Sequence, residues 1–377
     1  MPPKLLYLVT EDWYVLSHRL PMARAAQVAG FDVHVATRVV DGRARLEAEG
    51  FTVHALDWSR RDFDPQRLLG PVRQVRRLLA QLQPSVLHTI ALKPALIGSL
   101  AATGWRKLAV ITSINGLGSS YLARGFSGAV RRNALRAALA VLLRRARTIA
   151  VVQNPEDHAA LLALGLAEGR LRLVPGSGVD TDWLRVLPEP AGPVTLAYVG
   201  RMLADKGLRS LMAAHRLLRA RGETVQLLLA GTPDPDNPTS IPLAELEGWA
   251  REPGVAWLGH VTDVATVWAR AHIAVLPSRR EGLPLSLLEA AACGRPLIAS
   301  NVPGCREIVR PGETGLLVPF DDTPALASAI ESMANSAEQR TRMGAAARKL
   351  AVERFSAAAI GRQTADLYRS LVNVKTA

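Results

Sequence analysis

Residues 273–290 read Ile-Ala-Val-Leu-Pro-Ser-Arg-Arg-Glu-Gly-Leu-Pro-Leu-Ser-Leu-Leu-Glu-Ala. The first four form a short apolar run of the kind that makes a strand buried on both faces. A polar loop follows, and Pro284 then opens a second apolar stretch that suits a helix ending at Gly294. The stretch therefore predicts one repeat of a parallel α/β fold: a buried strand, a loop at its carboxyl end, and a helix that returns over the sheet.

Short apolar runs of this kind recur along the whole chain, separated by longer stretches with helical spacing. Such alternation is typical of a parallel sheet covered on both faces, and here it predicts two doubly wound α/β domains in tandem. In the first half we expect strands at 5–9, 33–36, 53–55, 86–88, 109–112, 149–152 and 171–174, with helices at 17–29, 66–82, 94–102 and 129–145. In the second half we expect strands at 195–199, 225–229, 256–258, 273–276, 297–299 and 315–318, with closing helices at 324–333, 337–353 and 357–371.

A proline-rich segment, Leu-Pro-Glu-Pro-Ala-Gly-Pro at 187–193, separates the two series. Because such segments commonly join domains, we expect a Rossmann-like domain over 1–186, a linker over 187–193 and a second Rossmann-like domain over 194–354. A C-terminal helix over 355–377 is expected to pack back on the first domain. Open parallel sheets bind ligands at the carboxyl ends of their strands, so we expect the two domains to face each other across a cleft.

The composition excludes several classes of protein. Hydrophobic residues make up 49% of the chain, which is enough for two buried cores and too much for a disordered protein. Two cysteines, Cys293 and Cys305, make no disulfide framework and favour a reducing compartment such as the cytoplasm. Glu11 and Asp12 interrupt the first apolar run, so we expect no signal peptide, and no apolar stretch is long enough to predict a transmembrane helix.

Two cations follow the first predicted strand of the second half. Residues 200–207 read Gly-Arg-Met-Leu-Ala-Asp-Lys-Gly, so Arg201 leaves the strand and Lys206 precedes the next helix. A guanidinium offers a planar fork of donors and an ammonium offers a point charge, and the two together suit a diphosphate. A lysine near a helix start is common on any protein surface, so this pair alone is a weak signal.

Two carboxylates and a helix N-terminus follow the strand at 273–276. Glu281 lies in the loop, and the backbone N–H groups of Leu285 and Ser286 are expected to face an anion with help from the helix dipole. Glu289 lies in an otherwise apolar helix, where a carboxylate is unfavourable unless it accepts hydrogen bonds. Sugar or ribose hydroxyls supply such donors. The alternative is a helix with a partly exposed glutamate and no ligand.

Taken together, these segments resemble the retaining GT-B glycosyltransferases of the large family 4. The resemblance rests on Gly-Arg-x4-Lys-Gly at 200–207 followed by Glu-x7-Glu from Glu281 to Glu289. It also includes Ser-Gly-Val-Asp at 177–180, Trp-Leu-Gly-His at 257–260, Val-Pro-Gly-Cys-Arg-Glu at 302–307 and Gly-x2-Gly-Leu-Leu-Val at 312–318. The resemblance extends over nearly the whole chain, and the motifs are specific as a set.

The resemblance implies that the second domain binds a nucleotide-sugar donor. Arg201 and Lys206 are expected to hold the diphosphate and stabilise its developing charge, and Glu281 is expected to bind the transferred sugar. Glu289 is expected to bind the ribose hydroxyls. The further donor-binding residues are Gly200, Gly259, His260, Gly282, Leu283, Leu285 and Ser286, of which Gly259 and His260 are expected near the base.

No metal or other cofactor is expected at this site. An Asp-x-Asp pattern at a strand end would predict a metal. Asp234-Pro235-Asp236 has that spacing but lies in a proline-rich loop, which we interpret as a turn. The resemblance implies that Arg201 and Lys206 replace the charge of the cation.

Polar residues also follow the predicted strands of the first domain, where the acceptor is expected. They are His18, Arg19, His88, Lys93, Asn115, Gly116 and Gly118. His18 and Lys93 are candidate catalytic residues, and each histidine, the lysine and the glycine turn also has a purely structural interpretation.

The patterns Ser-His-Arg-Leu-Pro at 17–21, Lys-Pro at 93–94 and Gly-Leu-Gly-Ser at 116–119 resemble a bacterial subgroup that extends sugars on undecaprenyl diphosphate. In that subgroup the donor is often a UDP-N-acetylhexosamine. The loop Thr-Glu-Asp-Trp-Tyr at 10–14 departs from the Gly-Gly of many family members, and Ile90 stands where many have a second histidine.

The net charge of +13 is concentrated in the first half of the chain, and no acidic residue occurs between Pro65 and Pro155. An arginine-rich composition alone would produce this pattern. The functional interpretation is attraction to an anionic membrane, with the basic apolar segment 124–147 lying at the interface. We therefore expect a cytoplasmic protein in peripheral contact with the inner face of the cell membrane.

The expected activity is retaining transfer of a hexose or N-acetylhexosamine from a UDP-sugar to a polyprenyl-diphosphate-linked saccharide in glycan assembly. A sugar-nucleotide epimerase of the same fold and a basic membrane-surface binding protein without catalysis are the alternatives. A nicotinamide oxidoreductase is disfavoured, because no Gly-x-Gly-x-x-Gly follows the first strand of either half. Only the charge suggests nucleic acid, and we expect none to bind.

Overall fold

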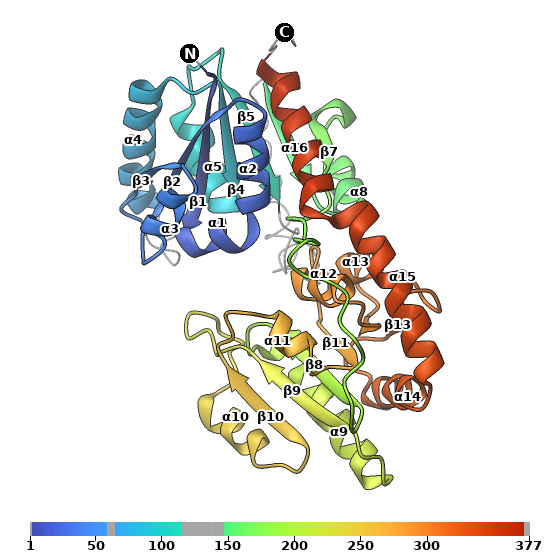
Figure 1. The fold of residues 1–377 in the computed structure, drawn as a ribbon. Helices are drawn as coiled ribbons and strands as arrows, with labels where there is room; N and C mark the ends of the chain where they lie inside the picture. Colours follow the sequence, from blue (N-terminus) through green and yellow to red (C-terminus); the bar gives the residue numbers. More distant parts are fainter. Residues whose placement is uncertain (1, 59–64, 115–136, 138–146, 373–377) are drawn as a thin grey trace. The chain divides into compact units, whose positions relative to one another are not determined.

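The computed structural model describes residues 2–58, 65–114, 137 and 147–372. The chain forms two α/β units (Figure 1). The first contains Met1–Ser177 and Ala357–Ala377, and the second contains Gly178–Ser356.

All described strands of the first unit lie in one parallel sheet, because each is a short apolar run followed by a crossover. The strands are β1 (Lys4–Glu11), β2 (Asp32–Arg38), β3 (Thr52–Ala55), β4 (Val86–Ile90), β5 (Ala109–Ile114), β6 (Thr148–Val152) and β7 (Leu171–Leu173), in the order β3-β2-β1-β4-β5-β6-β7. The helices are α1 (Asp12–His18), α2 (Leu20–Val28), α3 (Arg43–Ala48), α4 (Pro65–Leu82), α5 (Leu92–Ala101), α8 (Pro155–Ala163) and α16 (Ala357–Val372).

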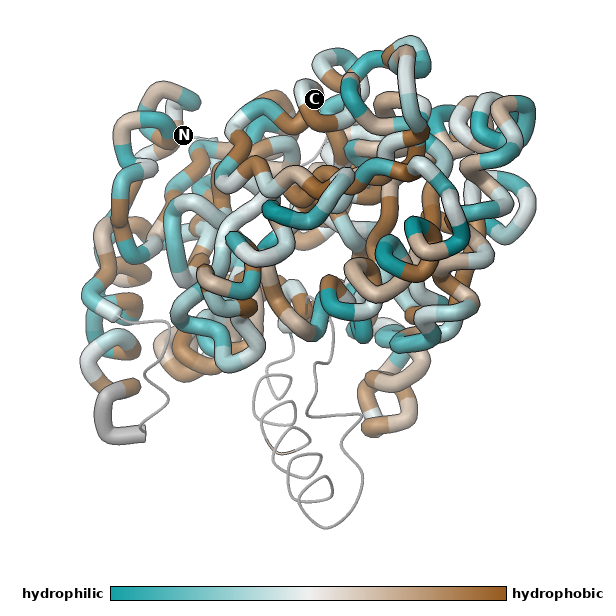
Figure 2. Tube along the Cα trace, turned by 90° about the horizontal axis from the view of Figure 1, so that it is seen from below, coloured by the Kyte–Doolittle hydropathy of each residue, from teal (hydrophilic) through white to brown (hydrophobic). Residues whose placement is uncertain are grey.

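Alternate residues of β1 enter different cores on the two faces of the first sheet. Leu5 and Tyr7 pack in the core that includes residues of α2 and α16. Leu6 and Leu8 pack in the core that includes residues of α4 and α5. Figure 2 shows hydrophobic and hydrophilic residues alternating along the outer helices, as expected of helices with one buried face. Helices therefore cover both faces of β1, whose residues Leu5–Val9 are buried.

The second unit repeats the architecture around a single core. Its strands are β8 (Thr195–Val199), β9 (Gln226–Ala230), β10 (Val255–Gly259), β11 (Ile273–Leu276), β12 (Leu297–Ser300) and β13 (Gly315–Val318), in the order β10-β9-β8-β11-β12-β13. Its helices are α9 (Leu208–Ala220), α10 (Leu243–Ala250), α11 (Ala265–Trp268), α12 (Leu285–Ala292), α13 (Pro303–Arg306), α14 (Thr323–Ala334) and α15 (Ala337–Phe355).

The boundary between the units lies at Ser177, before the proline-rich segment at 187–193. That segment is bound within the second unit rather than forming a separate linker: the backbone N–H of Leu187 donates to the Cys293 carbonyl, and Arg295 donates to the Pro188 carbonyl. The last helix, α16, belongs to the first unit and packs on α2.

The helix expected at 17–29 is in fact two helices, α1 and α2. The chain turns into α1 directly after β1, because the buried carboxylate of Asp12 accepts a hydrogen bond from the backbone N–H of Trp13 at 2.8 Å. Arg19 then leaves the helical conformation with φ −126°, and Pro21 stands in the first turn of α2. The expected helix at 129–145 lies outside the described residues.

Candidate active site

The loops after β8 and β11 meet at the carboxyl edge of the second sheet. These two strands are neighbours at the point where the strand order reverses, which is where open parallel sheets bind ligands. The backbone N–H of Arg279 donates to the Asp205 carbonyl at 2.9 Å and joins the two loops. Gly207 makes the approach possible, because it has φ +74° and a Cβ there would lie 2.0 Å from the Pro277 carbonyl oxygen.

Arg201 is held at the end of β8 by its backbone and by its side chain. The buried hydroxyl of Tyr198 donates to the Arg201 carbonyl at 2.7 Å, and burial raises the pKa of that hydroxyl well above its usual value. The guanidinium pairs with Asp234 at 2.7 Å and stays about half exposed. Asp234 lies in the loop that we interpreted as a turn, and the Asn237 N–H donates to its carbonyl at 2.8 Å as a turn requires. The pairing of Asp234 with Arg201 was not predicted from the sequence.

Lys206 and Glu281 pair directly, with 2.5 Å between Nζ and Oε1. The Glu281 side chain is 9% exposed and the Lys206 side chain 22%, so the pair is largely removed from solvent. Gly304 contacts the Glu281 loop: its backbone N–H donates a hydrogen bond to the Glu281 carbonyl at 3.3 Å. A Cβ at Gly304 would lie 2.3 Å from the Gly282 carbonyl oxygen, which explains the glycine in the Val-Pro-Gly pattern.

The helix α12 begins at Leu285, with Pro284 as its N-cap, so its N-terminus faces the same edge of the sheet. Leu285 and Ser286 are half-buried in its first turn, and Gly294 ends it with φ +74°, as the sequence predicted. Glu289 is half-buried, and its side chain has no hydrogen bond or ion pair with any residue that the structure describes. Burial raises its pKa to about 8.

The other expected donor-site residues follow neighbouring strands. Gly259 ends β10 with φ +65°, and its carbonyl accepts a hydrogen bond from the Gly231 N–H at 2.7 Å. His260 is exposed beside it, while Gly200, Gly282 and Leu283 are half-buried in the loops after β8 and β11. The structure thus brings Arg201, Lys206 and Glu281 to one edge of the sheet, with α12 beginning there.

His88 does not stand open to a ligand as expected of an acceptor-side residue. It is 2% exposed, its Nδ1 lies 2.7 Å from the Tyr368 hydroxyl, and its Nε2 lies 2.7 Å from the Ser113 hydroxyl. Tyr368 also bonds to the Tyr7 hydroxyl at 2.6 Å, so the network joins α16 to the sheet. Burial, with a smaller effect of the Arg19 charge, holds the pKa of His88 well below its usual value. Both ring nitrogens of His88 are therefore engaged by hydroxyl groups of the first unit.

His18, Arg19 and Lys93 occupy three different environments. His18 is half-buried at the end of α1, stacked on Tyr14 with 4.4 Å between ring centroids. Arg19 is 2% exposed and lines a cavity of about 10 Å³ with His88, which has room for roughly one water molecule and none for a sugar. Lys93 is buried in the first turn of α5. Asn115, Gly116 and Gly118 lie outside the described residues.

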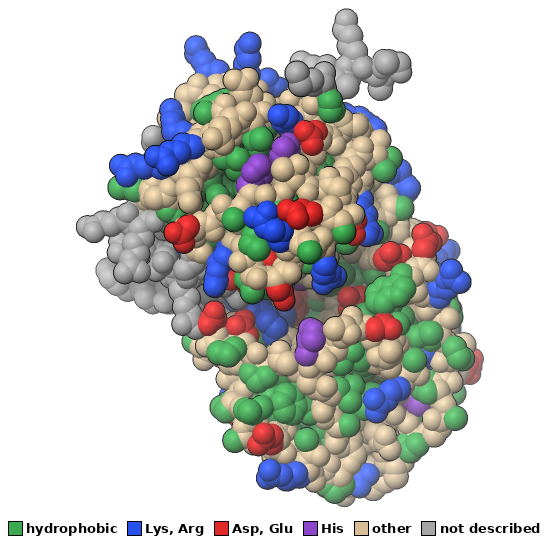
Figure 3. Space-filling model, turned by 60° about the vertical axis from the view of Figure 1, so that its left-hand side comes forward, with side chains coloured by type: hydrophobic (Ala, Val, Ile, Leu, Met, Phe, Trp, Pro, Cys, Tyr) green, Lys and Arg blue, Asp and Glu red, His purple; other side chains and the backbone are tan. Residues whose placement is uncertain are grey.

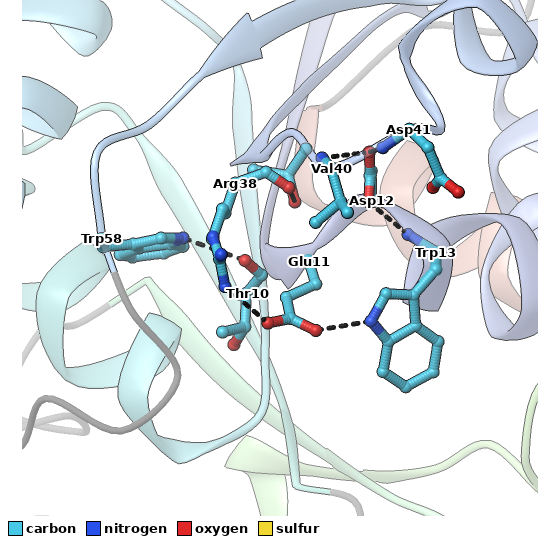
Figure 4. Close-up of polar contacts among 9 residues, drawn as sticks. Thr10, Glu11, Asp12, Trp13, Arg38, Val40, Asp41 and Trp58 are labelled. Atoms are coloured by element: carbon cyan, nitrogen blue, oxygen red, sulfur yellow. Dashed lines mark hydrogen bonds and ion pairs between the residues drawn. The ribbon is translucent and has the colours of Figure 1, made fainter. Parts of the chain in front are cut away.

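A polar cluster that sequence analysis had treated as an atypical loop lies at the carboxyl end of β1 (Figure 4). The Glu11 carboxylate accepts from Trp13 Nε1 at 2.5 Å and from Arg38 at 3.3 Å. Asp12 is fully buried, and one of its oxygens accepts from the backbone N–H groups of Val40, Asp41 and Gly42 at 2.8, 3.2 and 2.8 Å. Glu11 and Asp12, which interrupt the apolar run at the end of β1, are the signal that could have indicated this cluster.

The basic residues of the first unit are only partly described, since the segment 124–147 lies mostly outside the described residues. On the face shown in Figure 3, lysine and arginine side chains lie at several places among aspartate and glutamate. No described helix is both long and apolar enough to cross a membrane. The described residues also contain no group of three or more His, Cys, Asp or Glu side chains that could hold a metal ion.

Two family models match the chain, one on each unit. Residues 4–154 match the family described as Glycosyl transferase 4-like, and residues 193–336 match the family described as Glycosyl transferases group 1. With two parallel-sheet units of this topology, the matches define the chain as a glycosyltransferase with the GT-B fold.

Individual relatives agree with this class. A Bacillus subtilis protein named as a glycosyltransferase, EpsD, is 28% identical over 100% of this chain and 99% of its own length. The N,N'-diacetylbacillosaminyl-diphospho-undecaprenol alpha-1,3-N-acetylgalactosaminyltransferase of Campylobacter jejuni is 26% identical over 79% of this chain and 80% of its own length.

Solved structures show the same fold. The sucrose-phosphate synthase of Thermosynechococcus elongatus has a TM-score of 0.81 and 25% identity, covering 100% of both chains. Anabaena HepE, solved with UDP and glucose, has a TM-score of 0.79 and 17% identity, covering 98% of this chain and 100% of its own.

Proposed function

We propose that the protein is a retaining glycosyltransferase that moves a hexose or N-acetylhexosamine from a UDP-sugar to a saccharide on a polyprenyl diphosphate, in the assembly of a cell-surface glycan. The observation that carries the donor site is the meeting of Arg201, Lys206 and Glu281 at the switch point of the second sheet. The similarity to the undecaprenol-dependent transferase of Campylobacter jejuni supports the lipid-linked acceptor.

The two cations stabilise the diphosphate as it leaves. Each is paired with a carboxylate in this structure, Arg201 with Asp234 and Lys206 with Glu281, so neither charge is left isolated before the donor binds. A diphosphate brings more negative charge than either carboxylate and competes for the same N–H groups. Stabilising the charge that develops on the leaving group is usually the largest single contribution to catalysis in such reactions.

Glu281 and Glu289 orient the rest of the donor. Glu281 accepts hydrogen bonds from the transferred sugar, and Glu289 accepts them from the ribose hydroxyls. The acceptor hydroxyl attacks from the side of the leaving group, and the donor phosphate takes its proton, which preserves the configuration at the anomeric carbon. Because fixed cations supply the charge, no metal or other cofactor is needed, and turnover is expected to survive chelation with EDTA.

The test of this function is a screen of the purified protein with UDP-, GDP- and dTDP-sugars, using a bacterial membrane lipid extract as acceptor. With the active donor, Arg201→Ala and Lys206→Ala should each lower turnover by about a hundredfold or more, since each removes a stabiliser of the leaving group. Arg209→Ala is the matched control, because Arg209 is an exposed arginine of the same unit paired with Glu245. Full turnover in either site variant, or transfer from none of the donors, would refute the assignment.

We further propose that the basic first half binds the inner face of the cell membrane, where a lipid-linked acceptor is found. The proposal rests on the charge of the segment 124–147, each basic residue being worth about 1 kcal/mol near an anionic surface. Replacing Arg131, Arg132 and Arg136 together by alanine should reduce co-sedimentation with vesicles that contain anionic lipid. Unchanged co-sedimentation would rule out this contact.

A further inference from the structure

We infer that Glu11, Trp13 and Arg38 form the subsite that holds the terminal sugar of the acceptor, an inference that rests on the proposed function. These residues lie at the carboxyl end of β1 and β2 in the first sheet. Open parallel sheets bind ligands at the carboxyl ends of their strands, and β1, which carries Glu11, adjoins β4 where the strand order of this sheet reverses.

Glu11 and Arg38 together provide acceptors and donors for adjacent hydroxyl groups. Each oxygen of the Glu11 carboxylate accepts one hydrogen bond from the protein, whereas an ionised carboxylate has about four acceptor positions. The Arg38 side chain is 48% exposed and the Glu11 side chain 12%, and one Arg38 nitrogen donates to Glu11. A sugar hydroxyl can therefore donate to Glu11 while its neighbour accepts from the guanidinium.

Trp13 adds an apolar surface of the kind that packs on a sugar ring. Its side chain is 40% exposed, although its indole N–H is already bound by Glu11 (Figure 4). The hydrogen bond to Glu11 fixes the angle of the indole, so the exposed ring is presented in one orientation. An aromatic body with its polar end satisfied is suited to the C–H face of a sugar beside a carboxylate that binds its hydroxyls.

The cluster is rigid because Asp12 fixes its base. The buried Asp12 carboxylate accepts four backbone hydrogen bonds, three from Val40 to Gly42 and one from Trp13. Burying a carboxylate is unfavourable without such donors, so the loop after β2 and the start of α1 are held together. Gly42 allows a close approach here, because a Cβ at this position would lie 3.1 Å from Asp12 Cγ and one of the two residues would have to shift slightly. A binding group supported in this way loses little entropy when a ligand arrives.

The charges of the cluster indicate which part of the acceptor it binds. Glu11 and Arg38 neutralise each other, and Trp13 is uncharged. The donor site offers two cations to a diphosphate, Arg201 and Lys206, whereas this cluster offers one cation and an exposed indole face that suits a sugar ring. The subsite therefore recognises the saccharide of the acceptor and not its lipid diphosphate.

The experiment measures the amount of membrane lipid extract that gives half-maximal transfer from the active donor. Trp13→Ala and Glu11→Gln should each raise this amount about tenfold, as expected for a lost contact to a charged or aromatic group. Trp13→Phe keeps an aromatic face and should lie between wild type and Trp13→Ala. The Kd for UDP, measured by calorimetry, should be unchanged in all three variants.

Glu49→Gln is the matched control, because Glu49 is another carboxylate of the first unit paired with an arginine, Arg24. Glu49→Gln should change neither the half-saturating amount of lipid extract nor the Kd for UDP. If the wild-type protein transfers sugar but Trp13→Ala and Glu11→Gln keep the wild-type half-saturating amount, the subsite is wrong and the proposed function stands. If the wild-type protein transfers nothing from any donor, the proposed function fails and the subsite falls with it.

Discussion

Replacing Glu289 by glutamine should make the second unit more stable at neutral and alkaline pH. Burial raises the pKa of this carboxyl from its ordinary value of 4.5 to about 8. Since one pKa unit corresponds to about 1.4 kcal/mol, complete enclosure would destabilise the ionised folded state by about 5 kcal/mol. Glu289 is only half-buried, and solvent screening reduces the expected effect to about 2 kcal/mol.

The sign follows from which state holds the proton. Below pH 4.5 the carboxyl is protonated in the folded and unfolded states, so it contributes no difference. Between pH 4.5 and about 8 the unfolded chain releases the proton while the folded chain keeps it, so stability falls as the pH rises. Above about pH 8 the loss is complete. Glutamine does not titrate and should remove this dependence.

The assay is urea denaturation of the wild-type protein and Glu289→Gln from about pH 5 to about pH 8, followed by circular dichroism. The free energy of unfolding of the wild type, relative to the variant, should fall by about 2 kcal/mol over this range. Glu245→Gln is the control: the hydrogen bond with Arg209 lowers the pKa of Glu245, so this carboxyl is ionised in the folded and unfolded states throughout the range. The free energy of unfolding of the wild type relative to Glu245→Gln should therefore not change with pH between about 5 and about 8. Identical pH profiles for the wild type and Glu289→Gln would mean that Glu289 ionises normally in the fold.

Two further substitutions test the framework that positions the sites. Gly207→Ala should lower the free energy of unfolding by about 2 kcal/mol or more beyond the effect of Gly222→Ala. Both glycines have positive φ, but a Cβ at Gly207 would lie 2.0 Å from the Pro277 carbonyl oxygen, whereas a Cβ at Gly222 would meet no atom within 4 Å. Equal urea midpoints for the two variants would contradict this. Tyr368→Phe should lower the free energy of unfolding by about 1–3 kcal/mol, and by more than Tyr7→Phe does, because it removes the hydroxyl that bonds both Tyr7 and the buried His88. Denaturation curves in which Tyr7→Phe is the less stable variant would refute this order.

The strands could be predicted from the sequence because each buried run is almost wholly apolar and is bounded by polar or glycine residues. The strands Thr195–Val199, Ile273–Leu276 and Gly315–Val318 have the predicted bounds. The start of helix α1 could not be predicted in this way. Its first residue, Asp12, accepts four backbone hydrogen bonds, one from the neighbouring residue and three from a loop about thirty residues away. The helix propensity of the local sequence does not indicate a partner that lies so far away in the chain.

In the candidate site, too, some features could be predicted from the sequence and others could not. Motif spacing predicted that Arg201 and Lys206 follow one strand and Glu281 the loop of another, and topology alone brings those loops together. The pairing of Arg201 with Asp234 depends on the shape of a proline-containing loop, which spacing does not determine. His88 was placed correctly at a strand, but one of its hydrogen-bond partners is Tyr368, far away in the sequence. Side-chain partners across distant segments are therefore what sequence reasoning missed.

The discontinuity of the first unit has a consequence for synthesis on the ribosome. The second unit is one continuous segment, Gly178–Ser356, and α16 is translated only after it. The first unit must therefore wait, with the binding surface for α16 on α2 uncovered and Tyr7 lacking its hydroxyl partner, while an entire second core is made and folds. A nascent chain halted before Tyr368 would carry a finished second core beside an incomplete first one, which makes the uncovered α2 surface the expected point of contact for a chaperone.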